Sequence, residues 1–150
     1  MRLSDFIQPD ALALPLRATT ADQVLPELVS LLHLDEPASD TLLQVLRRRE
    51  ELGSTGVGKG IAIPHGRSPA VGRVQVAYAY APVGIPWRAV DDRPVQHFFL
   101  IAAPAIEVNN QYLPVLGKVA TFAKEPDVPE RLAQLKSPEE FFRLLEEKKV

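Results

Sequence analysis

The chain has 150 residues, 46% of them apolar and 24% charged, so we expect one globular domain spanning residues 1–150. A formal net charge of −2 gives no reason to expect nucleic-acid binding, which calls for a basic patch. Cysteine is absent, which excludes disulfides and thiolate metal sites.

The first residues do not resemble a targeting sequence, because they contain no long apolar core and soon reach Asp10. Nowhere does an uninterrupted apolar run approach the roughly 20 residues that a membrane helix needs. We therefore expect a cytoplasmic protein with no direct membrane insertion.

Two helices are predicted near the N-terminus. Thr20 and Gln23 have the spacing of a capping box at the start of a helix that runs to Leu32. Residues 35–39 are expected to form a linker. A second amphipathic helix is expected over residues 40–52, where a following glycine ends it.

Three strands are predicted in the middle of the chain. Residues 61–63 form a short apolar run, and residues 74–81 are richer in β-branched and aromatic side chains. Residues 82–86 carry two prolines and a glycine and are expected to form a turn. The third strand is expected over residues 95–102.

The last third of the chain is predicted to be helical. Asn109 and Asn110 are candidate N-caps for a helix over residues 112–122. A short helix is expected over 127–135, and Ser137 followed by a proline and two glutamates begins a final helix. Helices on both sides of several strands indicate a single α/β domain.

The most informative segment is Gly53–Arg67, with the sequence GSTGVGKGIAIPHGR. It places His65 between a proline and Gly66, and neutral imidazole is a good nucleophile near pH 7. The proline confines the preceding residue to extended geometry, and Gly66 allows backbone amides to approach a bulky anion. The arrangement suits a histidine that accepts and passes on a phosphoryl group.

A nucleotide-binding loop is the competing interpretation of these glycines. The run from Gly53 to Lys59 matches most of a P-loop, but Gly60 stands where a hydroxyl must hold Mg²⁺. The preceding segment is also helical in pattern, whereas a P-loop follows a strand. The glycines taken alone favour a flexible turn.

The two other histidines are interpreted as structural. His33 falls at the end of the first helix and is expected at the surface, and His97 is expected to be a partly buried strand residue with its hydrogen bonds satisfied. The spacing of the three histidines does not indicate a metal site. Arg47 and Arg48 are expected to be solvated, whereas Arg49 can fold back toward the reactive histidine and bind phosphoryl oxygens.

Residues 49–67 closely resemble the active-site segment of the fructose/mannitol-type IIA domains of the bacterial phosphotransferase system, and nitrogen-regulatory members look most similar. The likeness covers nearly the whole chain, and the GIAIPHG core within it is specific. It includes the segments Leu3–Phe6, Ala18–Ala21, Gly84–Pro86, Asp91–Val95 and Ser137–Glu140.

This resemblance implies an α/β three-layer sandwich, a mixed β-sheet with helices on both faces. It also implies a protein-histidine phosphotransferase in which His65 accepts a phosphoryl group from the phosphohistidine of HPr or an HPr-like carrier. The group then passes to a IIB domain, or the phosphorylation state acts as a regulatory signal. No cofactor or metal is implied, because the donor is already activated.

By position, Arg49 matches the arginine beside the phosphoryl group, and Thr55, Gly56 and Gly58 match the loop that lines its pocket. Arg67 is a second candidate for neutralising the phosphoryl charge, and backbone amides in the loop would add donors.

One residue departs from the family pattern. Members usually carry a second active-site histidine at the start of the helix after the third strand, where this chain has Tyr112. A tyrosine hydroxyl donates one hydrogen bond and supplies no positive charge, so we expect phosphorylation to be weaker than in relatives with two histidines. Two alternatives remain: a regulator read through its phosphorylation state, favoured by the absence of a fused IIB module here, or an interaction module that transfers nothing.

Overall fold

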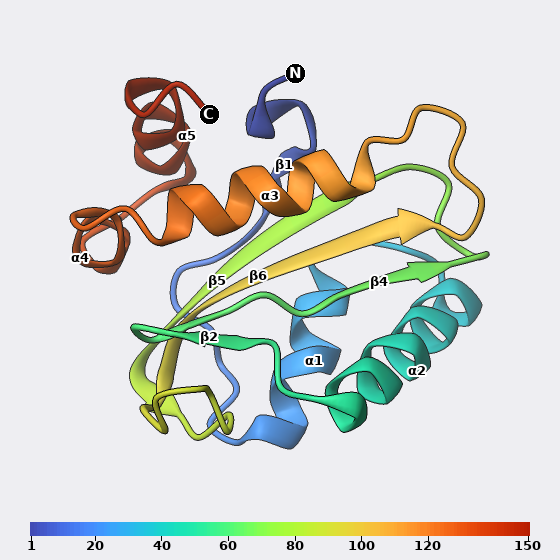
Figure 1. Cartoon of the computed structure of the whole chain (residues 1–150), viewed down its shortest axis with the longest axis horizontal. Helices are drawn as coiled ribbons and strands as arrows, with labels where there is room; N and C mark the ends of the chain where they lie inside the picture. The colour runs from blue at the N-terminus through green and yellow to red at the C-terminus, as the bar shows by residue number, and fades with distance from the viewer.

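The computed structural model describes residues 1–150 and shows three layers, with a central sheet between two groups of helices (Figure 1). Helices α3, α4 and α5 cover one face of the sheet, and α1 and α2 cover the other. The predicted α/β sandwich with a mixed sheet is confirmed. The elements in chain order are a 3₁₀ helix Leu3–Asp5, β1 Ile7–Ala13, α1 Ala21–Ser30, α2 Glu36–Leu52, β2 Gly56–Gly58, β3 Ile61–Ala62, β4 His65–Ser68, β5 Gln75–Ile85, β6 Val95–Pro104, α3 Tyr112–Ala123, α4 Val128–Ala133 and α5 Pro138–Glu147.

The sheet has the strand order β1-β5-β6-β3-β2, and β4 pairs with β6 as well. Strands β3 and β4 both run parallel to β6, with Ile61 opposite His97 and His65 opposite Ile101. They therefore follow one another along the same side of β6, with residues 63–64 as the break between them. No strand pairs with the outer side of β4, which leaves it as an open edge.

Both faces of the sheet are buried. On β5, Ala77 and Ala79 pack in the core shared with α1 and α2, whereas Val76 and Tyr78 pack in the core shared with the other helices. Strand β6 alternates in the same way. Burying a large apolar side chain is worth about 1.5–3 kcal/mol, so two-sided burial makes β5 and β6 the stable centre that positions β4.

The structure changes two expectations for the N-terminal helices. Thr20 is the N-cap of α1, but its side chain makes no capping bond; Gln23 instead accepts from the backbone N–H of the residue before Thr20, at 3.0 Å. The predicted linker 35–39 is wrong, because the carboxylate of Asp35 caps α2 and the helix begins at Glu36. The end of α2 is as predicted.

The strands also differ from the prediction. The expected turn at 82–86 is wrong, because β5 continues to Ile85 after a change of register beyond Tyr80. Strands β1, β2 and β4 were not predicted; β1 contains Pro9, a residue that argues against a strand, and its register with β5 shifts between Ile7 and Leu12. None of the helices combines the length and the hydropathy that crossing a membrane requires.

Candidate functional site

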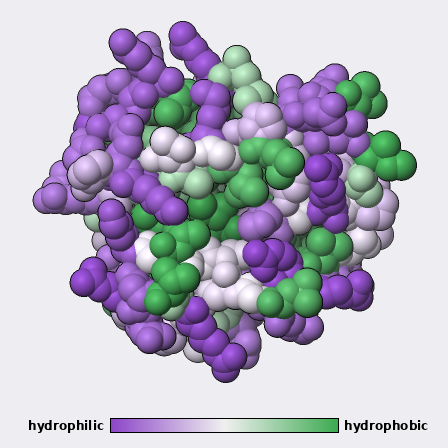
Figure 2. Space-filling view, viewed as in Figure 1, coloured by the Kyte–Doolittle hydropathy of each residue, from purple (hydrophilic) through white to green (hydrophobic).

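His65 lies in an open surface depression of about 430 Å³ at the free edge of the sheet. Its walls come from the end of α2, strand β4 and the start of α3, and Figure 1 shows β4 running between these two helices. On this face of the molecule, hydrophobic side chains gather in the middle and hydrophilic ones surround them (Figure 2). The lining residues are Val45, Arg48, Arg49, Leu52, His65, Gly66, Arg67 and Tyr112.

One ring nitrogen of His65 is anchored and the other is free. Nδ1 lies 2.6 Å from the backbone carbonyl oxygen of Ile63. A carbonyl oxygen only accepts hydrogen bonds, so Nδ1 carries the proton and donates it. The lone pair is then on Nε2, and the side chain is only partly buried. The imidazole is held in the tautomer that makes Nε2 a nucleophile.

Gly66 brings β4 close to α2. A Cβ atom at this position would lie 2.8 Å from Cγ1 of Val45, closer than real Cβ contacts come. The glycine therefore serves the packing of β4 on the helix, and this packing places the arginines of α2 beside His65. The same strand directs His65 and Arg67 to one side, because alternate residues of a strand share a face.

Three guanidinium groups line the depression. Nη1 of Arg49 donates to the backbone carbonyl of Gly53 at 2.7 Å, and Nη1 of Arg67 lies 3.3 Å from Oε1 of Glu107. Arg48, expected to be merely solvated, is the third. Such a concentration of guanidinium groups at an open surface suits an anion with several oxygens.

The ring of Tyr112 lies near both the histidine and one of these cations. Its ring centre is 6.3 Å from that of His65, and the guanidinium carbon of Arg67 lies 4.5 Å from the Tyr112 ring centre. Burial raises the pKa of the Tyr112 hydroxyl, while the charges of Arg67 and Arg49 act to lower it. Because the net shift is upward, the phenol stays neutral at physiological pH.

The start of α3 is capped by a residue that the sequence analysis missed. The carboxylate of Glu107 accepts hydrogen bonds from the backbone N–H groups of Gln111 and Tyr112, the latter at 2.8 Å. Asn109 and Asn110 are exposed, and neither is the N-cap, so the predicted caps are wrong. An acidic side chain shortly before a helix was the only available signal for Glu107.

The residues expected to form a phosphoryl-binding loop do not line the depression. Thr55 is buried, and its hydroxyl and backbone N–H both donate to Glu50. Gly56 packs so closely on Ala89 that a Cβ would lie 2.7 Å from the alanine Cβ. Gly58 lies against the β5–β6 connection. These residues join the end of α2 to the sheet.

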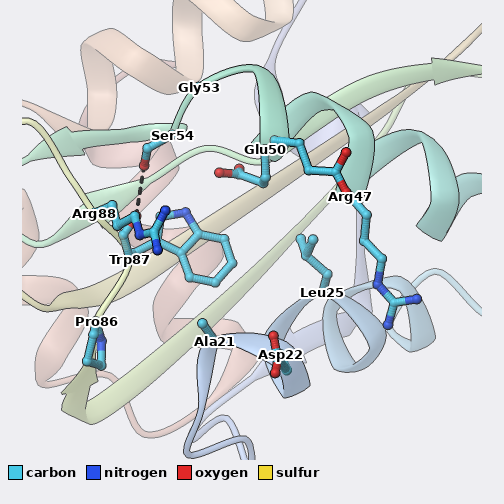
Figure 3. A pocket seen from close by; sticks show the side chains of 11 residues that line it. Ala21, Asp22, Leu25, Arg47, Glu50, Gly53, Ser54, Pro86, Trp87 and Arg88 are labelled. Carbon is cyan, nitrogen blue, oxygen red and sulfur yellow. Dashed lines mark hydrogen bonds between the residues drawn. The ribbon is translucent and has the colours of Figure 1, made fainter.

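A larger pocket of about 590 Å³ lies between the start of α1, the end of α2 and the β5–β6 connection (Figure 3). In it, Ser54 donates its hydroxyl to the backbone carbonyl of Trp87 at 2.9 Å, and Glu50 and Arg47 project from α2. None of the predicted phosphoryl-binding residues lines this pocket.

Neither of the other two histidines lines the depression. His33 is exposed, with Nε2 3.2 Å from Oδ2 of Asp10. His97 is buried, with Nδ1 2.8 Å from the hydroxyl of Tyr78, and burial lowers its pKa to about 4. No cluster of three or more histidine and acidic side chains is arranged to hold a metal ion.

Residues 5–148 match the family model described as "Phosphoenolpyruvate-dependent sugar phosphotransferase system, EIIA 2". The chain belongs to this family. The match covers both helical layers and the whole sheet, so the depression around His65 lies within the family domain.

Individual relatives include both free-standing and multi-component proteins. The chain is 28% identical to a nitrogen regulatory protein of Bradyrhizobium diazoefficiens over 97% of this chain and 95% of that protein. It is 29% identical to the 2-O-alpha-mannosyl-D-glycerate-specific EIIABC component of Escherichia coli over 99% of this chain, but it spans only 23% of that relative. Its fold matches the crystal structure of nitrogen regulatory protein IIA-Ntr from Neisseria meningitidis with a TM-score of 0.86 and 28% identity, covering 95% of this chain and 98% of that one.

Proposed function

We propose that this protein is a protein-histidine phosphotransferase that carries a phosphoryl group on Nε2 of His65. The observation that carries the proposal is the single hydrogen bond between Nδ1 and the carbonyl of Ile63, which leaves a nucleophilic nitrogen in an open depression lined by guanidinium groups. Family membership supports the same assignment.

The chemical step needs positioning and charge neutralisation more than covalent help from the protein. The lone pair on Nε2 of His65 attacks the phosphorus in line and forms a new N–P bond. The N–P bond of the donor phosphohistidine breaks, and its electron pair returns to the donor ring. If the other nitrogen of the donor ring is protonated, that ring leaves as neutral imidazole. His65 then becomes a positively charged phosphorylated ring, stabilised by donation from Nδ1 to Ile63.

Arg49 is the first candidate to neutralise the phosphoryl oxygens, and Arg67 is the second. Arg49 would exchange its bond to the Gly53 carbonyl for a charge-assisted bond to the phosphoryl group. Tyr112 can add one neutral donor. We expect Thr55, Gly56 and Gly58 to contribute through the backbone they hold in place, because none of them lines the depression.

The proposed donor is a phosphorylated HPr-like carrier protein, in the cytoplasm. The proposed acceptor is a IIB domain or a regulatory target. The two kinds of relative support both routes, since one is named a nitrogen regulatory protein and the other an EIIABC component of a sugar system. The near-complete coverage of the nitrogen regulatory protein favours the regulatory route.

Incubation with HPr-like carriers phosphorylated at histidine tests the function directly. The expected result is one phosphoryl group per chain, mapped to His65 by mass spectrometry under non-acidic conditions. His65→Ala should abolish the label, whereas His33→Ala should retain it. Label on another residue, or label that survives His65→Ala, would refute the assignment.

A second candidate function rests on Tyr112, which occupies the place of the family's usual second histidine. If transfer fails with every carrier while the protein still binds a target, the domain is a regulatory interaction module. Pull-down of targets by wild-type protein and by His65→Asp, which fixes a negative charge at the site, separates this case from a phosphorylation-dependent regulator.

A further inference from the structure

Glu107 lies in the connection between β6 and α3, and it contacts residues of β4 and α3 that line the depression. Its side chain is only 8% exposed although both neighbouring residues in the chain, Ile106 and Val108, are exposed. One carboxylate oxygen accepts the two backbone N–H groups at the start of α3, including that of Tyr112. The other faces Nη1 of Arg67 at 3.3 Å.

Arg67 is held on three sides. Nη1 contacts Glu107 at 3.3 Å and the backbone carbonyl of Pro104 at 3.4 Å, and the guanidinium carbon lies 4.5 Å from the ring centre of Tyr112. A guanidinium has five N–H donors, two of them on Nη1. Both acceptors face Nη1, so the three donors on Nη2 and Nε are left for a phosphoryl group.

We propose that Glu107 is a positioning residue for phosphoryl transfer, acting through Arg67. The inference rests on the proposed function and adds a determinant of its rate. Glu107 ties Arg67 to the α3 end that carries Tyr112, so the cation and its aromatic support stay aligned beside His65. Arg49 lacks such an arrangement, because its side chain donates to the carbonyl of Gly53 in its own segment and pairs with no carboxylate.

Glu107→Gln is the central variant, because a glutamine keeps an oxygen that can accept the helix N–H groups and places an NH2 donor where the carboxylate oxygen accepts from Arg67. Single-turnover transfer from a phosphorylated HPr-like carrier, measured against carrier concentration, gives the maximal rate and the half-saturating concentration. We expect the maximal rate to fall at least about tenfold, since Arg67 loses its charge-assisted anchor and faces an N–H donor instead. The half-saturating concentration should stay within about twofold, because Glu107 acts on the transferring group and not on carrier docking.

Two controls separate positioning from general stability. Glu27 also accepts two backbone N–H bonds, from Arg17 and Ala18 at 2.8 Å each, but pairs with no cation. Glu27→Gln should therefore leave the rate unchanged. In an Arg67→Met background, Glu107→Gln should cause no further loss, because the residue through which it acts is gone.

Arg67→Lys provides a second route if Glu107→Gln does not fold. Lysine keeps the positive charge but cannot engage two acceptors with a planar fork, so we expect a loss close to that of Arg67→Met. A wild-type rate for Arg67→Lys, or an equal Glu107→Gln loss with and without Arg67, would overturn the inference. Failure of wild-type protein to accept phosphate on His65 would instead refute the proposed function itself.

Discussion

Nδ1 of His65 lies 2.6 Å from the carbonyl oxygen of Ile63, a residue only two positions earlier in the chain. The contact is local because β3 ends at Ala62 and β4 begins at His65, with only Ile63 and Pro64 between them. Strand pairing to β6 on both sides of this break fixes the carbonyl and the imidazole relative to each other. The tautomer of the ring is thus determined by the backbone of the sheet edge.

The first prediction concerns this tautomer. At pH 8, ¹⁵N NMR of the unphosphorylated protein should show the His65 ring protonated on Nδ1, and the phosphorylated protein should carry its phosphorus on Nε2. His33, whose Nε2 and not Nδ1 faces a backbone carbonyl, that of Asp10 at 3.4 Å, serves as an internal reference. A dominant Nε2–H form, or phosphorus on Nδ1, would contradict the geometry.

The second prediction concerns Tyr112. A histidine there can carry a positive charge, and a charge-assisted contact is worth about 1 kcal/mol more than a neutral one, so Tyr112→His should speed transfer to His65 roughly fivefold. Tyr112→Phe is the matched control, because it keeps the ring beneath Arg67 and removes only the hydroxyl. If Tyr112→His is no faster than the parent, Tyr112 is functionally neutral and the arginines suffice.

The third prediction concerns the packing of β4 on α2. Gly66→Ala would place a methyl group 2.8 Å from Cγ1 of Val45, and relieving that overlap should lower the free energy of unfolding by about 1–3 kcal/mol. Gly117→Ala in α3 is the control, because nothing lies within 4 Å of its added Cβ. It should raise stability by about 0.5–1 kcal/mol through helix propensity. Denaturant titration measures both, and equal signs would contradict the packing argument.

The fourth prediction concerns acid stability. Burial lowers the pKa of His97 to about 4, so the unfolded chain, with a histidine pKa near 6.5, binds more protons between these values. Stability should therefore fall as pH drops from 6.5 toward 4, by up to about 2 kcal/mol between pH 7 and pH 5. His97→Gln should flatten this dependence and His33→Gln should not. Urea titrations at several pH values test it, and an unchanged slope in His97→Gln would assign the effect elsewhere.

The sequence was most informative where local patterns coincide with buried elements. The β-branched and aromatic residues of β5 and β6 pack on both faces, so their composition alone indicated strands. It was least informative for β1, which includes Pro9 and Asp10, and for β4, which has only four residues including Gly66. Those strands exist because β5 and β6 offer them partners, and partner strands are not visible in a local window.

The candidate site was likewise predictable only where its residues are close together in the sequence. His65 and Arg49 stand out in a contiguous segment, and the structure places both in one depression. Arg48 was not expected there, and Glu107 was missed altogether, because its role depends on a folded connection that brings it to Arg67, 40 residues away. Thr55 belongs to the same contiguous segment but points to Glu50, since adjacency in sequence does not fix which side of a loop a side chain takes.

The nucleophile and a cation both lie on β4, and this limits how the site can change in evolution. His65 and Arg67 are alternate positions of a single short strand, so inserting or deleting one residue in the segment before it, residues 63–64, would shift the register of β4 and turn both side chains toward the opposite layer together. A change in length at this edge therefore displaces the nucleophile and the cation together. A substitution, such as the one at Tyr112, can instead change the rate of phosphoryl transfer gradually.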